Sequence, residues 1–256
     1  MGKVAFITGA TGGIGTAMAE TFMKRGDKVV FSDMAGAPIA ETVKKYKEQG
    51  FECHGIECDV VDESQINAAI DETVKKYGSL DILINNAGLQ HVCMIEDFPT
   101  ERFKYLIDVM TIAPFVATKR VLPIMKANKY GRIINMSSIN GVIGFAGKSA
   151  YNTAKHGLIG LTRVTALEVA NHGITANAVC PGYTDTFIVR NQFEDLARTR
   201  NIPLEEVLDQ ILYPLIPMRR LLNVQEIADY VDFLTSEKAS AITGQVCLVD
   251  GGYTVQ

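Results

Sequence analysis

The sequence lacks the features that mark membrane-spanning, nucleic-acid-binding and disulfide-stapled secreted proteins. No apolar run reaches the length of about 20 residues that a membrane-spanning helix needs, and the N-terminal residues do not have the layout of a signal peptide. Acidic residues outnumber basic ones by 29 to 25, so the net charge of −4 gives no reason to expect nucleic acid or an anionic membrane as a partner. We therefore expect a cytoplasmic protein.

Cysteine is scarce as well. The 256 residues include five cysteines, an odd number, and most of them lie inside apolar stretches, which predicts reduced thiols in the core. Cys53 and Cys58 have neither a second cysteine pair nor a nearby histidine pair, so no metal site is predicted. Hydrophobic residues, in contrast, make up 47% of the chain. This supply is sufficient for a large core, and we expect one domain over residues 1–256.

Short apolar runs alternate with helical patterns along the chain. The alternation predicts an α/β fold: a doubly wound, Rossmann-type parallel sheet of about seven strands with helices on both faces. One long helix over 101–126 is predicted to kink at Pro114, and the irregular stretch at about 187–218 is predicted to form a helical lid over the substrate. The predicted strands are 4–7, 28–32, 53–58, 80–84, 132–136, 174–180 and 245–249.

A glycine-rich turn follows the first predicted strand. The run from Gly9 to Gly15 has the spacing G-x-x-x-G-x-G, and such a turn at a helix N-terminus presents backbone N–H groups to a phosphate. The second predicted strand ends at Asp33, whose carboxylate can accept hydrogen bonds from both ribose hydroxyls of an adenosine and would repel a 2′-phosphate. The alternative is that Asp33 simply caps a turn.

A serine, a tyrosine and a lysine mark the start of another predicted helix. Ser138 follows the predicted strand 132–136, and Tyr151 and Lys155 lie four residues apart on one helix face. A nearby cation favours the anion of a phenol, so Lys155 can activate Tyr151 as a general acid or base while Ser138 hydrogen-bonds the substrate oxygen. An isolated Tyr–Lys pair would more often be a solvated helix face.

These motifs, in this order, resemble the short-chain dehydrogenase/reductase family over essentially the whole chain. The resemblance implies Ser138, Tyr151 and Lys155 as catalytic residues and a homotetramer as the assembly. It implies NAD as the cofactor, because neither Gly12 nor Met34, where NADP enzymes of the family often carry a basic residue, is charged. The implied cofactor-binding residues are Gly9, Thr11, Gly13, Ile14, Gly15, Asp33, Asp59, Val60, Asn86, Ala87, Gly88, Tyr151, Lys155, Pro181, Gly182, Thr184 and Thr186.

Met110 departs from the family pattern. The family usually has an asparagine there, 41 residues before the tyrosine, which holds a water molecule in a proton relay with the lysine. A methionine side chain cannot hold that water. Two interpretations stay open: the relay runs through backbone carbonyls, or the enzyme is slowed or has become an NAD-binding protein with a vestigial site. The intact Ser138, Tyr151 and Lys155 weigh against the vestigial site.

Within the family, the closest resemblance is to bacterial D-3-hydroxybutyrate dehydrogenases. It is carried by Leu89–Val92, Ile95–Pro99, Gly147–Lys148 and Ala154–Gly157. The resemblance implies a small hydroxy acid or its ketone as substrate, with 3-hydroxybutyrate and acetoacetate as the leading pair. The alternative is another 3-oxo or hydroxy compound, such as an acyl thioester or a polyol.

The same resemblance implies how the carboxylate of a hydroxy acid is held. Charge-assisted hydrogen bonds from one cation and two amides would satisfy it. Asn140 stands where those enzymes have histidine, and because asparagine cannot be cationic, it predicts a weaker hold on the carboxylate. The chain has no Trp, and Tyr183 and Tyr253 stand where those enzymes have tryptophan. These smaller rings predict a wider pocket. The implied substrate-binding residues are Gln90, Ser138, Asn140, Lys148, Tyr151, Tyr183, Gln192 and Tyr253.

Overall fold

The framework of the fold is a seven-stranded, fully parallel sheet. The computed structural model describes residues 2–190, 193, 197 and 202–255. The strand order is β3-β2-β1-β4-β5-β6-β7, so the direction of winding reverses between β1 and β4, where ligands bind in sheets of this kind. The strands are β1 Val4–Thr8, β2 Lys28–Asp33, β3 Cys53–Glu57, β4 Ile82–Asn85, β5 Gly131–Met136, β6 Ile174–Pro181 and β7 Val246–Val249.

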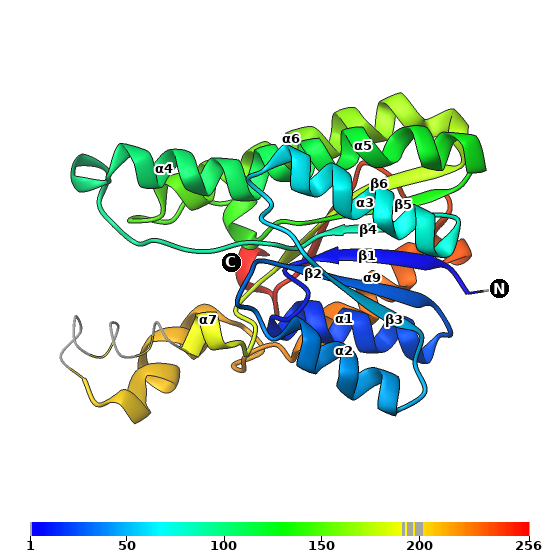
Figure 1. Cartoon of the computed structure of the whole chain (residues 1–256). Coiled ribbons are helices and arrows are strands. Elements are labelled where there is room, and N and C mark those ends of the chain that lie inside the picture. The colour runs from blue at the N-terminus through cyan, green and yellow to red at the C-terminus, as the bar shows by residue number, and fades with distance from the viewer. Residues whose placement is uncertain (1, 191–192, 194–196, 198–201, 256) are drawn as a thin grey trace.

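Helices cover both faces of the sheet. Figure 1 shows α3, α4, α5 and α6 on one side and α1, α2 and α9 on the other. The predicted doubly wound, single-domain sheet is confirmed. The helices are α1 Gly13–Lys24, α2 Ile39–Glu48, α3 Glu63–Tyr77, α4 Thr100–Ile107, α5 Ala113–Asn128, α6 Ser149–Val169, α7 Phe187–Arg190 and α9 Val224–Thr235.

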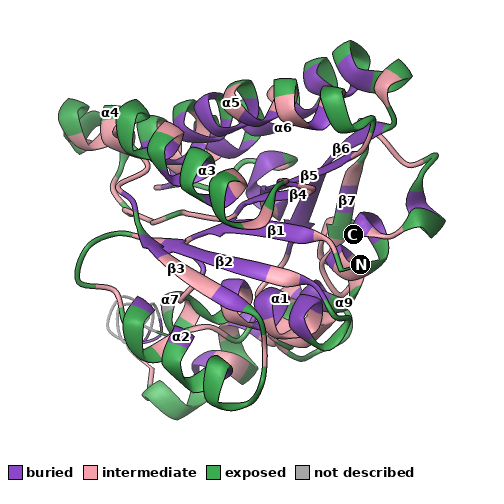
Figure 2. Cartoon of the chain, turned by 45° about the vertical axis from the view of Figure 1, so that its right-hand side comes forward, coloured by how far each residue is buried: buried purple, intermediate pink, exposed green. Residues whose placement is uncertain are grey.

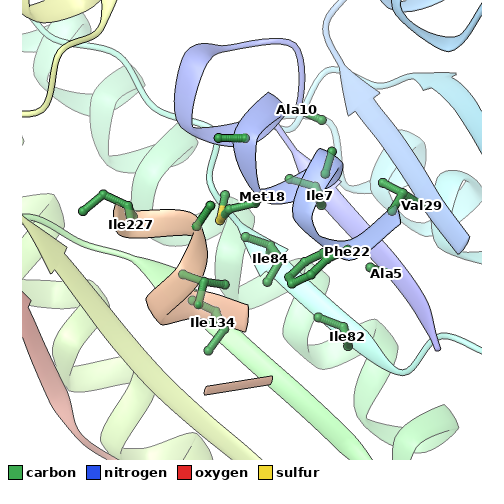
Figure 3. Close-up of a cluster of buried hydrophobic side chains, with 14 of the residues drawn as sticks. Ala5, Ile7, Ala10, Met18, Phe22, Val29, Ile82, Ile84, Ile134 and Ile227 are labelled. Carbon is green, nitrogen blue, oxygen red and sulfur yellow. The ribbon is translucent and has the colours of Figure 1, made fainter. Parts of the chain in front are cut away.

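Two apolar clusters attach these helices to the sheet, one on each face. The central strands between them, β1, β4, β5 and β6, are buried on both sides, whereas the edge strands β3 and β7 are partly accessible and the outer surfaces of the helices are exposed (Figure 2). Burial of this apolar surface stabilises the fold by about 25 cal/mol per Å². Figure 3 shows the cluster beneath α1 and α9, which includes Ala5, Ile7, Ala10, Met18, Phe22, Val29, Ile82, Ile84, Ile134 and Ile227.

Local signals set the ends of α3. Before its first turn, the Asp62 carboxylate accepts hydrogen bonds from the backbone N–H groups of Ser64 and Gln65, which have no partners within the helix. The helix ends at Gly78, which has a φ of 83°. Glycine adopts this left-handed conformation without Cβ strain, so the chain can leave the helix toward β4.

The predicted long helix over 101–126 differs from the structure in one respect. A π-helical turn at Asp108–Ile112 separates α4 from α5, and Pro114 lies in the first turn of α5. Proline has no N–H to donate there, and π turns are often found at functional sites. Met110 lies within the π turn and is fully buried.

The described part of the predicted lid is helical. It contains α7, 3-10 turns at Leu204–Glu206 and Tyr213–Leu215, and a π-helical turn at Leu208–Leu212. Phe193, Ala197, Val207 and Leu212 form a small apolar cluster, against which Tyr183 and Val189 pack. The segment thus has its own packing and lies against one wall of the cavity described below.

Two further observations concern the whole chain. All five cysteines are free, and four of them are buried while Cys93 is half-buried. In the part of the chain that the structure describes, no helix is both long enough and apolar enough to cross a membrane.

Candidate active site

A cavity of about 430 Å³ lies at the carboxyl ends of the strands. Its walls come from the turns that follow β1, β4, β5 and β6, from the start of α6 and from α7. The structure therefore brings most of the predicted residues together. The predicted residues that line the cavity are Gly9, Thr11, Gly13, Ile14, Gly15, Asp33, Asn86, Ala87, Gly88, Gln90, Ser138, Asn140, Lys148, Tyr151, Lys155, Pro181, Gly182, Tyr183, Thr184 and Thr186.

The turn between β1 and α1 fits a pyrophosphate. No side chain caps the N-terminus of α1, so its first N–H groups are free to bind an anion. A Cβ on Gly15 would lie 2.5 Å from the carbonyl oxygen of Gly9, and Gly9 itself has a φ of 61°. Only glycine allows this close passage of the backbone, which leaves a shallow cradle beside the helix N-terminus.

Asp33 ends β2 and faces the same cavity. The backbone N–H and the hydroxyl of Thr11 both donate hydrogen bonds to Asp33 Oδ2, over 3.0 and 2.6 Å, and the Met34 N–H donates to Oδ1 over 2.9 Å. The carboxylate therefore caps the glycine turn and also lines the cavity. Both functions that the sequence suggested for Asp33 are compatible with this geometry.

Asn86 braces the glycine turn. Its side-chain N–H₂ donates to the carbonyl oxygens of Thr8 and Gly9, over 3.0 and 2.9 Å, and the N–H groups of Asn86 and Ala87 donate to the Thr8 hydroxyl. The side chain thus holds two strand ends together. Its contribution to a cofactor site is mainly to fix the shape of the wall.

Ser138, Tyr151 and Lys155 converge on the cavity from β5 and α6. Ser138 Oγ accepts a hydrogen bond from the Asn140 N–H over 3.2 Å, so its own hydroxyl proton can be donated, and in the free protein the Ser138 hydroxyl also interacts with Tyr151. The Lys155 Nζ donates to the Met136 carbonyl oxygen over 2.7 Å and lies 5.5 Å from the centroid of the Tyr151 ring. The predicted serine, phenol and ammonium therefore share one wall.

Burial sets the protonation of this group. It raises the pKa of Tyr151, an effect that the hydrogen bond with Ser138 opposes, and it lowers the pKa of Lys155 to about 8. Removing a charge from water favours the neutral form of each group. In the free protein Tyr151 is therefore a phenol that can donate a proton, and the predicted lowering of its pKa by Lys155 is not found there.

Lys148 is the second buried cation of the cavity. Its side chain is only 7% exposed, and burial lowers its pKa to about 8. Its Nζ lies 4.5 Å from the centroid of the Phe145 ring, and no carboxylate among the described residues pairs with it. Nearby on the cavity wall, the buried Nε2 of Gln90 has no hydrogen-bond partner. Both side chains therefore bring hydrogen-bond donors without a partner among the described residues to the lining of the cavity.

Three of the remaining predicted residues, Asp59, Val60 and Tyr253, do not line the cavity. Asp59 and Val60 lie on the loop after β3, where the Asp59 Oδ1 accepts from the N–H of Val61. Tyr253 packs on Tyr183, with ring centroids 5.8 Å apart, behind the wall. Gln192 lies outside the described residues. Cavity residues that the sequence did not suggest are Gly12, Leu89, Met136, Ser137, Ile139, Phe187 and Val189.

The additional cavity residues lie close in sequence to the predicted ones. Each lies next to, or within a few residues of, a predicted site residue. The available signal was their position at strand carboxyl ends or at the start of the predicted lid. No group of three or more histidine, cysteine, aspartate or glutamate side chains in the described ranges is arranged to hold a metal ion.

Comparison with known proteins gives consistent matches. The family model described as short chain dehydrogenase matches residues 3–197. The chain is 55% identical over 254 residues to a Bacillus subtilis protein called uncharacterized oxidoreductase YxjF, covering 99% of each. It is 37% identical over 255 residues to a D-beta-hydroxybutyrate dehydrogenase of Cupriavidus necator, covering 100% of this chain and 99% of that one.

Solved structures match equally well. An actinorhodin polyketide ketoreductase variant with NADPH has a TM-score of 0.94 at 33% identity, covering 98% of this chain and 97% of that one. An NAD⁺-bound xylitol dehydrogenase has a TM-score of 0.92 at 32% identity, covering 98% of both chains. The TM-scores show that these proteins share the overall fold, and their titles name NADPH in one case and NAD⁺ in the other.

Proposed function

The chain belongs to the short chain dehydrogenase family, and we propose that it is an NAD-dependent dehydrogenase that oxidises the secondary alcohol of a small hydroxy acid. 3-Hydroxybutyrate, with acetoacetate as its ketone, is the leading substrate. The proposal includes a homotetramer that works in the cytoplasm. Family membership supports a nicotinamide cofactor and hydride transfer, and the side chains of this cavity support the finer choices.

Lys148 is the observation that carries the substrate class. A buried ammonium without a carboxylate partner among the described residues is unstable by itself. It lies three residues before Tyr151 on the wall of the same cavity, where the unpartnered Nε2 of Gln90 is also found. A substrate carboxylate would accept hydrogen bonds from both the Lys148 ammonium and the Gln90 Nε2, and the bond from Lys148 would be charge-assisted. A neutral alcohol would leave the cation unpaired.

The proposed chemistry follows from the positions of Ser138, Tyr151 and Lys155. When bound, the nicotinamide accepts a hydride from the alcohol carbon. Ser138 donates its hydroxyl proton to the substrate oxygen and holds this oxygen beside Tyr151. Tyr151 takes the alcohol proton as the phenolate during oxidation, and as the phenol it gives a proton to the ketone oxygen during reduction. Lys155, fixed by the Met136 carbonyl, keeps its other donors for the cofactor ribose and favours the phenolate form of Tyr151.

Asp33 supports NAD as the cofactor. Its carboxylate faces the cavity beside the glycine cradle, and a negative charge there repels the 2′-phosphate of NADP. No lysine or arginine lines the cavity near Asp33. The two cationic side chains that line the cavity, Lys148 and Lys155, lie beside Tyr151, where the substrate is proposed to bind. Among the described residues that line the cavity, none therefore provides a positive charge for a 2′-phosphate beside Asp33.

The direct test is NADH formation by the purified protein with (R)-3-hydroxybutyrate and NAD. We expect turnover of this acid, at least about tenfold weaker turnover of 2-butanol, which has no carboxylate, and no comparable rate with NADP. Lys148→Met serves as the matched variant and loses the preference for the acid. Efficient turnover of 2-butanol or of a polyol, without turnover of (R)-3-hydroxybutyrate, would refute the proposed substrate class. It would not affect the assignment to the family.

A further inference from the structure

Phe145 is an aromatic side chain outside the cavity that lies against one of the buried cations. The Lys148 Nζ is 4.5 Å from the centroid of the Phe145 ring, a distance at which the negative face of the ring attracts a cation. Phe145 is 38% exposed and is not a member of the apolar clusters that the described residues form. Packing in the core therefore does not explain a large ring at this position.

The backbone brings the ring and the ammonium together. Residues 145–148 form a tight turn, in which the Lys148 N–H donates to the Phe145 carbonyl oxygen over 3.2 Å. Gly147 has a φ of 78°, which the third residue of a type II turn needs and glycine adopts without strain. Such a turn places the Cα atoms of its first and last residues within about 7 Å of each other. The contact thus follows from the local sequence.

Neighbouring elements hold this turn on both sides. The Cys93 N–H, from the loop after β4, donates to the Gly147 carbonyl oxygen over 2.9 Å. From α6, the Asn152 Nδ2 donates to the Ile143 carbonyl oxygen over 2.8 Å. Because the backbone that carries the Phe145 ring is tied to two elements of the cavity wall, the ring keeps a fixed position relative to the cavity.

A ring holds a cation in a way that suits an anion-binding wall. An acidic partner would neutralise the Lys148 ammonium and compete with an anionic substrate, whereas a ring face attracts the ammonium without cancelling its charge. At pH 7 this charge is present, because burial lowers the pKa of Lys148 only to about 8. A lysine side chain loses rotamer freedom when it is ordered. An ammonium that is already in place does not lose this freedom again when a ligand binds.

We propose that Phe145 is a positioning residue, which holds the Lys148 ammonium at the cavity wall so that the carboxylate of a hydroxy acid meets a cation already in place. The inference rests on the proposed function, since it requires that Lys148 binds this carboxylate. Phe145 acts only through Lys148, because it does not itself line the cavity. Leucine at this position would keep an apolar side chain but would have no ring face to hold the ammonium.

The test is the steady-state kinetics of Phe145→Leu at pH 7 with saturating NAD. We expect KM for (R)-3-hydroxybutyrate to rise about three- to tenfold, the cost of ordering one long side chain on binding. Both kcat and the KM for 2-butanol, which has no carboxylate, should change less than about twofold. Phe145→Tyr, which restores a ring face, should return KM for the acid to within about twofold of the wild type.

Two controls separate this effect from a general disturbance. Phe233→Leu makes the same change on α9 at a side chain that is 39% exposed and does not line the cavity, so it should leave every kinetic constant unchanged. In a Lys148→Met background, Phe145→Leu should no longer raise KM for the acid, because the cation that the ring holds is gone. Melting curves check that each variant is folded.

The outcomes distinguish this inference from the proposal on which it rests. A wild type that does not turn over (R)-3-hydroxybutyrate, or a Lys148→Met variant with the wild-type KM for it, overturns both. If Lys148→Met does raise this KM, the role of Phe145 alone is wrong when Phe145→Leu has no effect, or when it raises KM equally for 2-butanol or in the Lys148→Met background. A rise confined to the acid, and reversed by Phe145→Tyr, supports the inference.

Discussion

At the scale of single residues, Lys148 is a buried cation that lines the cavity at a cost in stability. Burial lowers its pKa to about 8 from the ordinary value of 10.5. Between these pH values the unfolded chain binds more protons than the folded one, so the free energy of unfolding rises with pH across this window. Below pH 8 the full penalty remains, on the order of 3 kcal/mol at 1.36 kcal/mol per pH unit.

Replacing Lys148 with methionine should therefore stabilise the protein. At pH 7 we expect Lys148→Met to raise the free energy of unfolding by about 1–3 kcal/mol, and the gain should shrink as the pH rises from 8 toward 10.5. Denaturant titrations at several pH values measure it. Lys119→Met, on the exposed surface, is the control and should change little. A destabilised Lys148→Met would show that a group in the free protein already neutralises this cation.

The same cation should leave a signature in the kinetics. Because Lys148 loses its charge above pH about 8, kcat/KM for a hydroxy acid should fall there. Lys155 has a similar pKa and affects every substrate, so the quantity to follow is kcat/KM for the acid divided by that for a neutral secondary alcohol. We expect this ratio to decline through pH 8 in the wild type and to be flat in Lys148→Met. A flat ratio in both would place the carboxylate elsewhere.

Tyr151 is the residue on which the proposed chemistry depends most. Tyr151→Phe keeps the half-buried ring and removes only the proton donor and acceptor. We expect kcat to fall by about 10²–10⁴-fold, the usual contribution of general acid–base catalysis, while NAD binding is retained. Tyr183→Phe, on the same cavity wall, should lose less than about tenfold. Wild-type turnover in Tyr151→Phe would rule out the acid/base assignment.

At the scale of elements, the turn between β1 and α1 allows a sharp comparison of two glycines. A Cβ on Gly15 would lie 2.5 Å from the Gly9 carbonyl oxygen, which is a clash with backbone. A Cβ on Gly12 would lie 3.5 Å from the same oxygen, which is an ordinary van der Waals contact. We expect Gly15→Ala to cost about 1–3 kcal/mol through overpacking and Gly12→Ala to cost much less. Thermal melting measures both. Equal melting temperatures would mean that the turn can shift without penalty.

The elements themselves were largely predictable, because most strands are short, mainly apolar runs followed by turn or helix signals. The π turn at Asp108–Ile112 was not. Its sequence continues the helical pattern on both sides, and the extra residue shows only in the hydrogen bonds of the backbone. Pro114 was predicted to kink the helix; it lies in the first turn of α5, and the change of helix type lies just before it.

The site was predictable to the extent that topology determines it. Residues at the carboxyl ends of β1, β4, β5 and β6 had to meet in one place once the sheet was parallel. What spacing along the chain could not show was side-chain direction. Asn86 points back onto Thr8 and Gly9, and the Thr11 hydroxyl turns to Asp33. Contacts of this kind join residues far apart in sequence, and no local pattern encodes them.

At the scale of the whole molecule, the exposed apolar side chains of α5 and α6 concern assembly. Phe115, Val164 and Leu167 are exposed, and Leu167 is 81% accessible. At the edge of the sheet, β7 has no neighbour on its outer side among the described strands, and its Leu248 is also exposed. Apolar groups at solvent-facing positions of neighbouring elements commonly mark subunit interfaces. An edge strand has unpaired backbone N–H and C=O groups that can pair with a strand of another chain.

We therefore expect light scattering to report four copies of the 28.0 kDa chain. Leu167→Glu places a charge where the helices α5 and α6 would meet a partner, and a buried unpaired charge is costly, so the variant should dissociate to a smaller species. Ile95→Glu, at an exposed position far along the chain from α6, is the control and should keep the wild-type mass. A monomeric wild type would refute the tetramer. A tetramer unaffected by Leu167→Glu would instead assign the contact to other surfaces, with the edge of β7 to be tested next by Leu248→Lys.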